Sequence, residues 1–127
     1  MSSIAMLLGR ILLSAIFIEA GLSKLIHLGA TVAYFESVGL PFPSLVVWPV
    51  IALELVGGLA VLFGFQILIA ATALGVFALA AALIGHGDFS NITHFQAFMK
   101  DLAIAGGLFY AASQGAGLIS LDARRGV

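Results

Sequence analysis

The sequence predicts an all-α integral membrane protein, a bundle of four transmembrane helices with a short interfacial helix between the first two. Of its 127 residues, 62% are hydrophobic and only 9% are charged. A soluble domain carries roughly a quarter of its residues as Asp, Glu, Lys or Arg. A helix needs about 20 apolar residues to cross the bilayer core, and such segments occur at about 4–26, 44–64, 66–85 and 95–113. We expect them to form a single membrane domain.

The first expected helix, 4–26, begins after Ser2 and Ser3, which are residues that cap helix N-termini. Three charged residues, Arg10, Glu19 and Lys24, lie within it. A cleaved signal peptide is the alternative interpretation, but the basic flank of a signal peptide precedes its apolar run. Here the first basic residue is Arg10, inside the run. We therefore expect a membrane helix.

The second and third expected helices come from one apolar stretch, residues 45–85, in which Glu54 is the one charged residue. As a single helix this stretch would measure roughly 60 Å, twice the thickness of the bilayer core. It must therefore fold back, and Gly64 and Gln66 mark the most suitable break. The sequence Pro41-Phe42-Pro43 favours a turn just before the first of these two helices.

The remaining segments carry weaker patterns. Val32, Phe35 and Val38 recur at helical spacing and Gly39 follows them, which predicts the short interfacial helix. The fourth helix ends at the glycine-rich sequence 114–117. Small residues also recur along the helices, where they predict surfaces of close helix packing: Gly57, Gly58, Ala71, Gly75, Ala103, Gly107 and Ala111.

The composition argues against several classes of function. A net charge of -1 argues against a nucleic-acid-binding face, and the absence of cysteine excludes disulfides, thiolate metal sites and a cysteine nucleophile. His27, His86, Asp88 and His94 have side chains that ligate metals, but their spacing matches no tight metal-binding motif. We expect these histidines to lie apart at a membrane interface, and we expect no metal or haem.

The few charges within the expected helices are the most informative feature. A charge at the middle of a membrane helix costs between ~3 and ~10 kcal/mol, so each one needs a partner, a polar cavity or neutralisation. Glu54 lies near the middle of its helix, and Arg10 lies towards the side of the termini. The other candidates gather towards the opposite side: Glu19, Lys24, His86, Lys100 and Asp101. This clustering predicts a site for a small molecule, a quinone headgroup or a proton path.

The partners of these charges stay open at the level of sequence. Glu54 can pair with Arg10, Lys24 or Lys100. Glu19 lies roughly on the opposite side of its helix from Arg10, so the helix is central in the bundle, or Glu19 faces a partner subunit or is protonated. Structural ion pairs that fix the order of the helices are the alternative to a functional site.

Several stretches, in this order, resemble the DoxX family of small four-helix membrane proteins. They are Gly9-Arg10, Ala20-Gly21-Leu22-Ser23-Lys24, Gly39-Leu40-Pro41, Glu54-Leu55-Val56-Gly57-Gly58, His86, Lys100-Asp101-Leu102-Ala103-Ile104-Ala105-Gly106-Gly107 and Ser120-Leu121-Asp122. The similarity covers nearly the whole chain. Two residues depart from the family pattern: Asp101 stands where the family often has Asn, and Glu19 is not part of the pattern.

The resemblance implies a bundle in the cytoplasmic membrane, usually of a bacterium, and a link to membrane redox chemistry. Relatives are described as subunits of a thiosulfate:quinone oxidoreductase or quinol oxidase, or as members of complexes that handle oxidative and thiol stress. We therefore hypothesise a subunit or accessory of a quinone-linked redox complex whose site contains Glu54, Arg10, Lys24 and Lys100. No cofactor is evident from the residues, and the expected ligand is a quinone or another small hydrophobic molecule.

Two alternative functions stay open. Small multidrug-resistance exporters also consist of four short helices with a membrane carboxylate, and Glu19 favours that interpretation. The basic groups beside the glutamates, however, disfavour a cationic substrate. A structural membrane anchor with no activity of its own is the second alternative, and any enzymatic activity in the main hypothesis belongs to the complex.

Four spans would place both termini on the same side of the membrane. The basic residues divide into Arg10, Arg124 and Arg125 on the terminal side against Lys24 and Lys100 on the other. The positive-inside rule then places both termini in the cytoplasm. We expect contacts with the lipid bilayer and with a protein partner or further copies of the chain.

Overall fold

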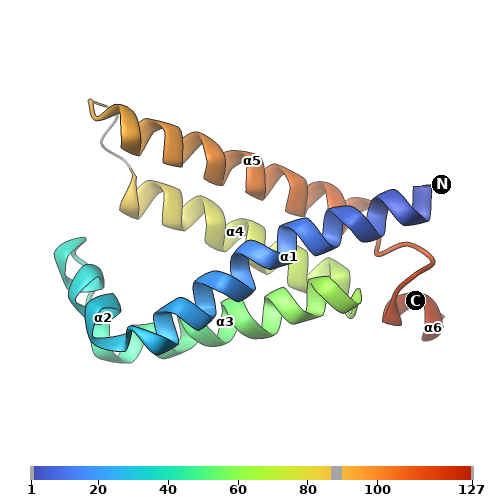
Figure 1. The fold of residues 1–127 in the computed structure, drawn as a ribbon, viewed down its shortest axis with the longest axis horizontal. Coiled ribbons are helices and arrows are strands. Elements are labelled where there is room, and N and C mark those ends of the chain that lie inside the picture. Colours follow the sequence, from blue (N-terminus) through green and yellow to red (C-terminus); the bar gives the residue numbers. More distant parts are fainter. Residues whose placement is uncertain (1, 87–89, 127) are drawn as a thin grey trace.

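The computed structural model describes residues 2–86 and 90–126, and every regular element in these residues is a helix. In chain order the helices are α1 (Ser2–Ile26), α2 (Leu28–Ser37), α3 (Pro43–Phe63), α4 (Ile67–Gly85), α5 (Ile92–Gln114) and α6 (Leu121–Arg124), as Figure 1 shows. Three helices, Ser3–Ile26, Pro43–Phe63 and Ile67–Gly85, are long and apolar enough to cross a membrane. The all-helical fold class is therefore confirmed.

Several helices begin earlier than the sequence pattern predicts, among them α5 and α2. The helix α5 begins at Ile92 instead of residue 95, because the Asn91 side chain accepts a hydrogen bond from the backbone N–H of Thr93 at 2.9 Å and so caps the helix. The helix α2 begins at Leu28, two residues after the end of α1, and the backbone N–H and the hydroxyl of Thr31 both donate to the carbonyl of His27 at 2.9 Å. The break between α3 and α4 falls at residues 64–66, as predicted.

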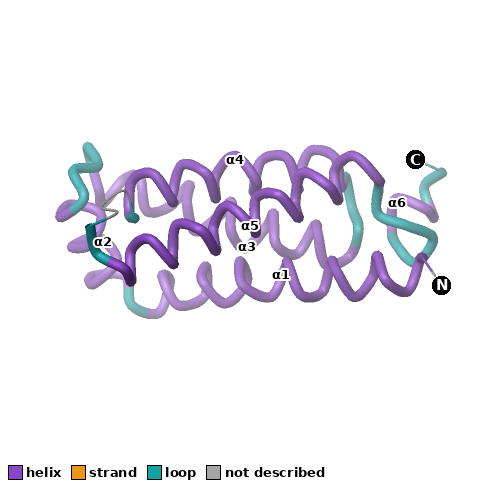
Figure 2. The backbone as a smooth tube through the Cα atoms, turned by 90° about the horizontal axis from the view of Figure 1, so that it is seen from above, coloured by secondary structure: helices purple, strands orange, loops and turns teal. Residues whose placement is uncertain are grey.

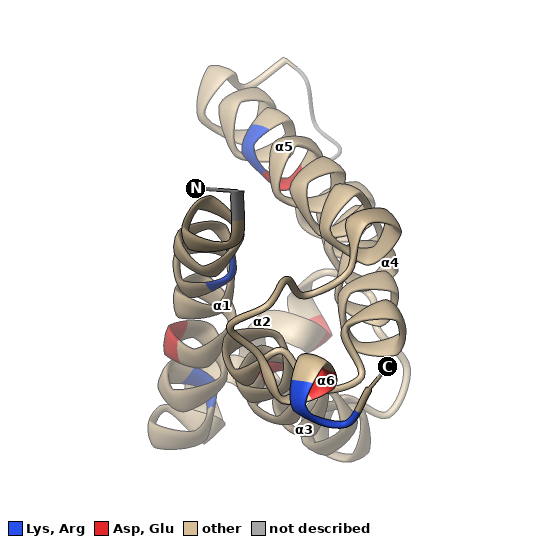
Figure 3. Ribbon diagram, turned by 90° about the vertical axis from the view of Figure 1, so that its right-hand side faces the viewer, with Lys and Arg blue, Asp and Glu red and all other residues tan. Residues whose placement is uncertain are grey.

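The long helices pack as two pairs, α1 with α3 and α4 with α5, and α3 also contacts α4. The helices α1 and α5 touch little, so the bundle is open between them, which the end view in Figure 3 makes visible. Figure 2 shows the long helices lying side by side, with α2 at one end of the bundle and both chain termini at the other. We call these the α2 end and the terminal end.

Glycines allow the paired helices to approach closely. A Cβ atom placed on Gly57 would lie 3.1 Å from Leu74 of α4, and one on Gly75 would lie 2.6 Å from the ring of Phe109 on α5. Small residues at helix crossings are typical of membrane bundles, so the predicted packing role of these two glycines is confirmed. Ala103, predicted to pack in the same way, is instead exposed on α5.

Arg10 of α1 caps the C-terminal end of α3. Its Nη1 donates to the carbonyls of Leu62 at 3.0 Å and Val61 at 3.4 Å, and its Nη2 donates to the carbonyl of Ile119. The last carbonyls of a helix have no partner within it and carry a partial negative charge. Arg10, which is 3% exposed, meets both needs. Its proximity also leaves no room for a side chain at Gly64, whose φ of 68° already favours glycine.

Asp122, from the C-terminal segment, caps the beginning of α4 in the complementary way. Its Oδ1 accepts from the backbone N–H of Gln66 at 2.7 Å, and its Oδ2 accepts from that of Ile67 at 2.9 Å. The backbone N–H of Asp122 donates in turn to the carbonyl of Gly64 at 2.9 Å. A carboxylate at a helix N-terminus also matches the positive end of the helix dipole. The turn between α3 and α4 is thus closed by residues from both ends of the chain.

Replacing Asp122 with Ala should destabilise the fold, because two backbone N–H groups at the start of α4 lose their acceptors. We expect a loss of about 1–2 kcal/mol in the free energy of unfolding, measured by thermal denaturation of the purified protein in detergent. Arg124→Ala, in the same short helix but exposed, is the matched control. Equal stability of the two variants would contradict the capping role.

Candidate functional site

An ion pair between α1 and α3 stands at the centre of the candidate site. The Nζ of Lys24 lies 2.9 Å from Oε1 of Glu54 and donates a hydrogen bond to Oε2 at 3.1 Å. Oε1 is close to the ammonium group but off the hydrogen-bond direction, so it has no hydrogen-bond partner among the described residues. The Glu54 side chain is 4% exposed and that of Lys24 is 24% exposed. Of the three cations that the sequence allowed as partners of Glu54, the fold selects Lys24.

The local sequence around Gly21 explains why Lys24 reaches Glu54. A Cβ atom on Gly21 would lie 2.7 Å from Leu55 and 3.3 Å from the Cβ of Glu54, so the backbone of α1 passes directly against α3 at this point. Residues three positions apart lie on the same face of a helix. The glycine therefore allows the contact between the helices, and Lys24 extends from the same face towards the carboxylate.

A cavity of about 410 Å³ lies beside the ion pair. Its walls are mostly apolar and come from all five helices α1 to α5, including Phe17, Val50, Phe77 and Ile104. Five polar or titratable side chains also line it: Lys24, Tyr34, Glu54, His86 and Asp101. An apolar cavity with a few convergent polar groups is the usual form of a small-molecule site.

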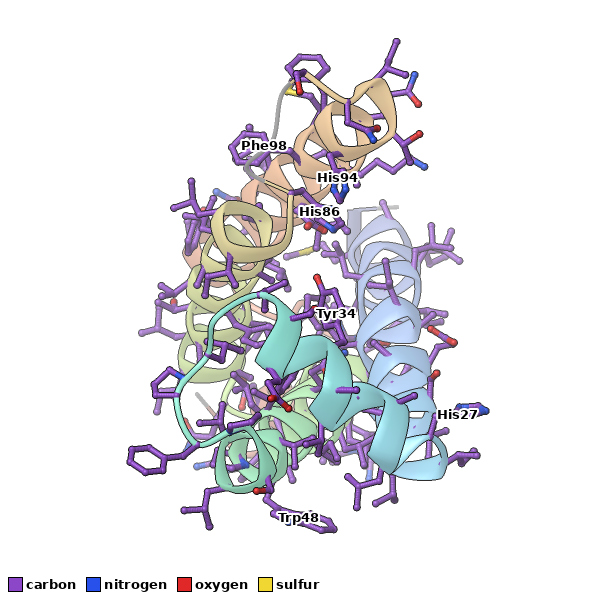
Figure 4. The ribbon with its side chains drawn as sticks, turned by 90° about the vertical axis from the view of Figure 1, so that its left-hand side faces the viewer. His27, Tyr34, Trp48, His86, His94 and Phe98 are labelled. Atoms are coloured by element: carbon purple, nitrogen blue, oxygen red, sulfur yellow. The ribbon has the colours of Figure 1, made fainter. Side chains whose placement is uncertain are left out.

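Tyr34 was missed by the sequence analysis, although the helix that carries it was expected. Its neighbour Phe35 is buried against Val47 and anchors α2 to α3. With α2 held there, Tyr34 points inwards, as Figure 4 shows. Its hydroxyl oxygen lies so close to Gly85 that a Cβ atom added to this glycine would be only 2.6 Å away. Tyr34 thereby lies against the end of α4 and forms part of the cavity wall. The signal in the sequence was the position of Tyr34 directly before Phe35, the residue that anchors the short helix.

The structure corrects the expectation that the histidines lie apart. His86 and His94 face each other across the α4–α5 connection, with their Nδ1 atoms 3.1 Å apart, and His86 also lines the cavity (Figure 4). His27 lies exposed on the outside of the bundle. Asp88, which completes the motif considered from sequence, lies outside the described residues. The described residues contain no group of three or more ligating side chains that could hold a metal.

The remaining predicted candidates lie away from this cavity. Arg10 caps α3 near the terminal end, where it borders a second cavity of about 460 Å³ between α1 and α5. Glu19 and Lys100 are exposed on α1 and α5 and line neither of these two cavities. The fold therefore brings Lys24, Glu54, His86 and Asp101 to one cavity and leaves the other three candidates outside it.

Comparison with known proteins gives consistent matches. The sequence model of the DoxX family matches residues 5–87. The chain is 37% identical to the inner membrane protein YqjF of Escherichia coli over 122 residues, which cover 96% of this chain and 92% of the relative. It is 32% identical over 127 residues to the inner membrane protein YphA of Escherichia coli, covering 95% and 90% of the two chains.

A third relative comes from a different bacterium. Over 116 residues the chain is 33% identical to a Bacillus subtilis protein named "Putative oxidoreductase CatD", covering 85% of this chain and 84% of the relative. No solved structure matches the chain at a significant level.

Removing the cation from the ion pair should cost more stability than removing both partners. Lys24→Met leaves the buried Glu54 carboxylate unpaired, and we expect a loss of about 3 kcal/mol, the lower end for a broken buried pair. The double variant Lys24→Met/Glu54→Leu should recover most of this loss, because apolar pairs replace buried ion pairs well. Chemical or thermal unfolding in detergent measures both. A double variant that is less stable than Lys24→Met would contradict the pairing.

Proposed function

Because the chain belongs to the DoxX family of membrane proteins, we propose that it binds a quinone in the cavity beside Glu54. It acts there as a subunit or accessory of a quinone-linked redox complex in the cytoplasmic membrane. The observation that carries this proposal is the composition of the cavity wall, an apolar enclosure that contains the Lys24–Glu54 ion pair together with Tyr34, His86 and Asp101.

The chemistry of this wall suits a quinone ring. The ring is flat and apolar, and its carbonyl oxygens accept hydrogen bonds. Lys24 and Tyr34 supply donors, since an ammonium group has three N–H bonds and only one is used towards Glu54. Reduction of a quinone consumes protons as well as electrons, and Glu54, Asp101 and His86 are groups that can transfer protons. Binding, orientation and proton transfer are therefore the roles we assign to this chain.

Electrons reach the quinone from a protein partner in this proposal. The chain has no cysteine, so it carries no thiol–disulfide couple of its own. The name of the Bacillus subtilis relative includes the word oxidoreductase, and this supports a redox setting. We therefore assign the redox-active centre to the partner and the quinone-binding step to this chain.

The proposed membrane arrangement contains four spans. The helix α5 has 23 residues and, at 1.5 Å per residue, is about 35 Å long. It packs along α4, one of the three apolar spans. Its charged pair Lys100 and Asp101 lowers its mean hydropathy, but Asp101 lines the cavity instead of facing lipid. The short helix α2 then lies at the outer interface, and both termini lie in the cytoplasm, in accordance with the positive-inside rule.

The two alternatives remain separable from this proposal by experiment. For an exporter, proton-coupled uptake into proteoliposomes would be lost in Glu19→Gln. Of the two carboxylates that line the cavity, Glu54 and Asp101, Glu54 is already paired with Lys24, which disfavours a cationic drug beside it. For a purely structural anchor, replacing both Lys24 and Glu54 with apolar residues would restore stability and also leave the cellular phenotype intact.

The proposal predicts that Glu54→Gln weakens quinone binding. The substitution keeps the side-chain shape but removes the charge that orients Lys24, so we expect about tenfold weaker binding of a short-chain benzoquinone, or roughly 1.4 kcal/mol. Binding is measured on the purified protein in nanodiscs, and quinone-dependent turnover in native membranes. Glu36→Gln, exposed on α2 and outside the cavity wall, is the control. Unchanged binding and turnover in folded Glu54→Gln would refute the site.

The proposed topology can be tested with single cysteines, because the natural chain has none. Ser37→Cys, exposed at the end of α2, should react with a membrane-impermeant maleimide added to intact cells. Arg124→Cys, exposed in α6, should react only after permeabilisation. Labelling of both from the same side would show that α5 does not cross the membrane, and labelling in the reverse order would overturn the assigned orientation.

A further inference from the structure

Two opposite charges are left on the outside of the protein within its long helices. Glu19 on α1 and Lys100 on α5 are both exposed. Within residues 2–86 and 90–126, neither forms an ion pair or a side-chain hydrogen bond. Glu19 lies in an apolar span, where an unpaired charge costs several kcal/mol. A short carboxylate cannot extend to the interface as a long lysine can, so a cation supplied by another chain would stabilise an ionised Glu19.

The two charges lie at nearly the same depth. Glu19 is seven residues before Ile26, the last residue of α1, and Lys100 is eight residues after Ile92, the first residue of α5. At 1.5 Å per residue these separations are about 10 and 12 Å. Both helix ends lie at the α2 end of the bundle, as Figure 1 shows. Depth matters because two copies inserted in the same orientation are related by an axis along the membrane normal, which preserves the depth of every residue.

The surfaces around the two charges suit helix–helix contact. On the face of Glu19, α1 presents the exposed apolar residues Leu12, two turns earlier and 74% exposed, and Leu22, one turn later and 46% exposed. One turn after Lys100, α5 presents the exposed small residue Ala103, and the exposed side of the helix continues to Gly106, where an added Cβ atom would meet nothing within 4 Å. Small residues let the backbones of two membrane helices approach closely. Ala103, which is exposed in the protomer, is therefore available for a helix contact outside it.

We propose that the chain forms a dimer of two parallel copies in which Glu19 of one protomer pairs with the partner's Lys100. Twofold symmetry repeats the pair in the opposite sense, so the contact buries both unpaired charges of each protomer. The apolar face of α1 lies against the small-residue face of α5 from the second copy. Neither Glu19 nor Lys100 lines the proposed quinone cavity, so the proposed dimer does not depend on the proposed ligand.

Disulfide trapping tests the contact directly in the natively cysteine-free chain. One tagged copy carries Glu19→Cys and a differently tagged copy carries Lys100→Cys, and the two are co-expressed and oxidised in membranes. The expected product is a disulfide-linked pair that contains both tags. Leu68→Cys, exposed on α4, replaces Glu19→Cys in the matched control. The absence of the mixed product, or an equal yield with the control, would overturn the proposal.

Charge reversal distinguishes the ion pair from general stickiness of the helices. Copies that all carry Glu19→Lys, or all carry Lys100→Glu, place like charges together, so two tags on the same variant should no longer co-purify. A Glu19→Lys copy co-expressed with a Lys100→Glu copy has complementary charges at both contacts and should co-purify as well as the wild type. Association of either variant with itself, or failure of the mixed pair with folded copies, would refute the pairing. If Glu19 and Lys100 instead face a different protein, the mixed pair of charge-reversed copies would also fail to co-purify.

Discussion

The ion pair between Glu54 and Lys24 is the interaction on which the candidate site depends. A carboxylate buried among apolar helices is unfavourable unless a cation meets it. Lys24 can do so because Gly21, one turn earlier, lets α1 pass directly against α3. The same contact fixes the C-terminal part of α1. The helix ends at Ile26, and α2 begins at Leu28, two residues later. The position of Tyr34 against Gly85, where it lines the cavity at the α2 end, follows from that placement.

The scarcity of charge gives each charged group a distinct use. Arg10 caps the C-terminal end of α3 and Asp122 caps the N-terminal end of α4, so each charge meets the opposite partial charge of a helix end. Lys24 and Glu54 neutralise each other at the cavity wall. Glu19 and Lys100 find no partner within the described residues and lie on the outer surface. One physical cost, that of a bare charge in an apolar medium, thus underlies a structural cap, the proposed binding site and the proposed association surface.

The three uses occupy different parts of the molecule, which limits their mutual interference. The capped turn lies at the terminal end, whereas the cavity opens between the helices towards the α2 end. The exposed charges lie on faces of α1 and α5 that line neither cavity. A change at one of these regions can therefore be measured with little effect on the packing of the others.

Sequence alone was sufficient for the helical class, the membrane setting and the break at residues 64–66, because these depend on segment length and local composition. It also predicted that Lys24, His86 and Asp101 lie towards one side of the membrane and that Glu54 lies near the middle of its helix, because depth follows from position along a helix. It could not choose between Arg10, Lys24 and Lys100 as the partner of Glu54, nor foresee that His86 and His94 meet. Those contacts depend on the rotation and crossing of helices distant in the chain. Only the tertiary structure decides them, as it also decides that Asp122 caps α4 and that Tyr34 lines the cavity.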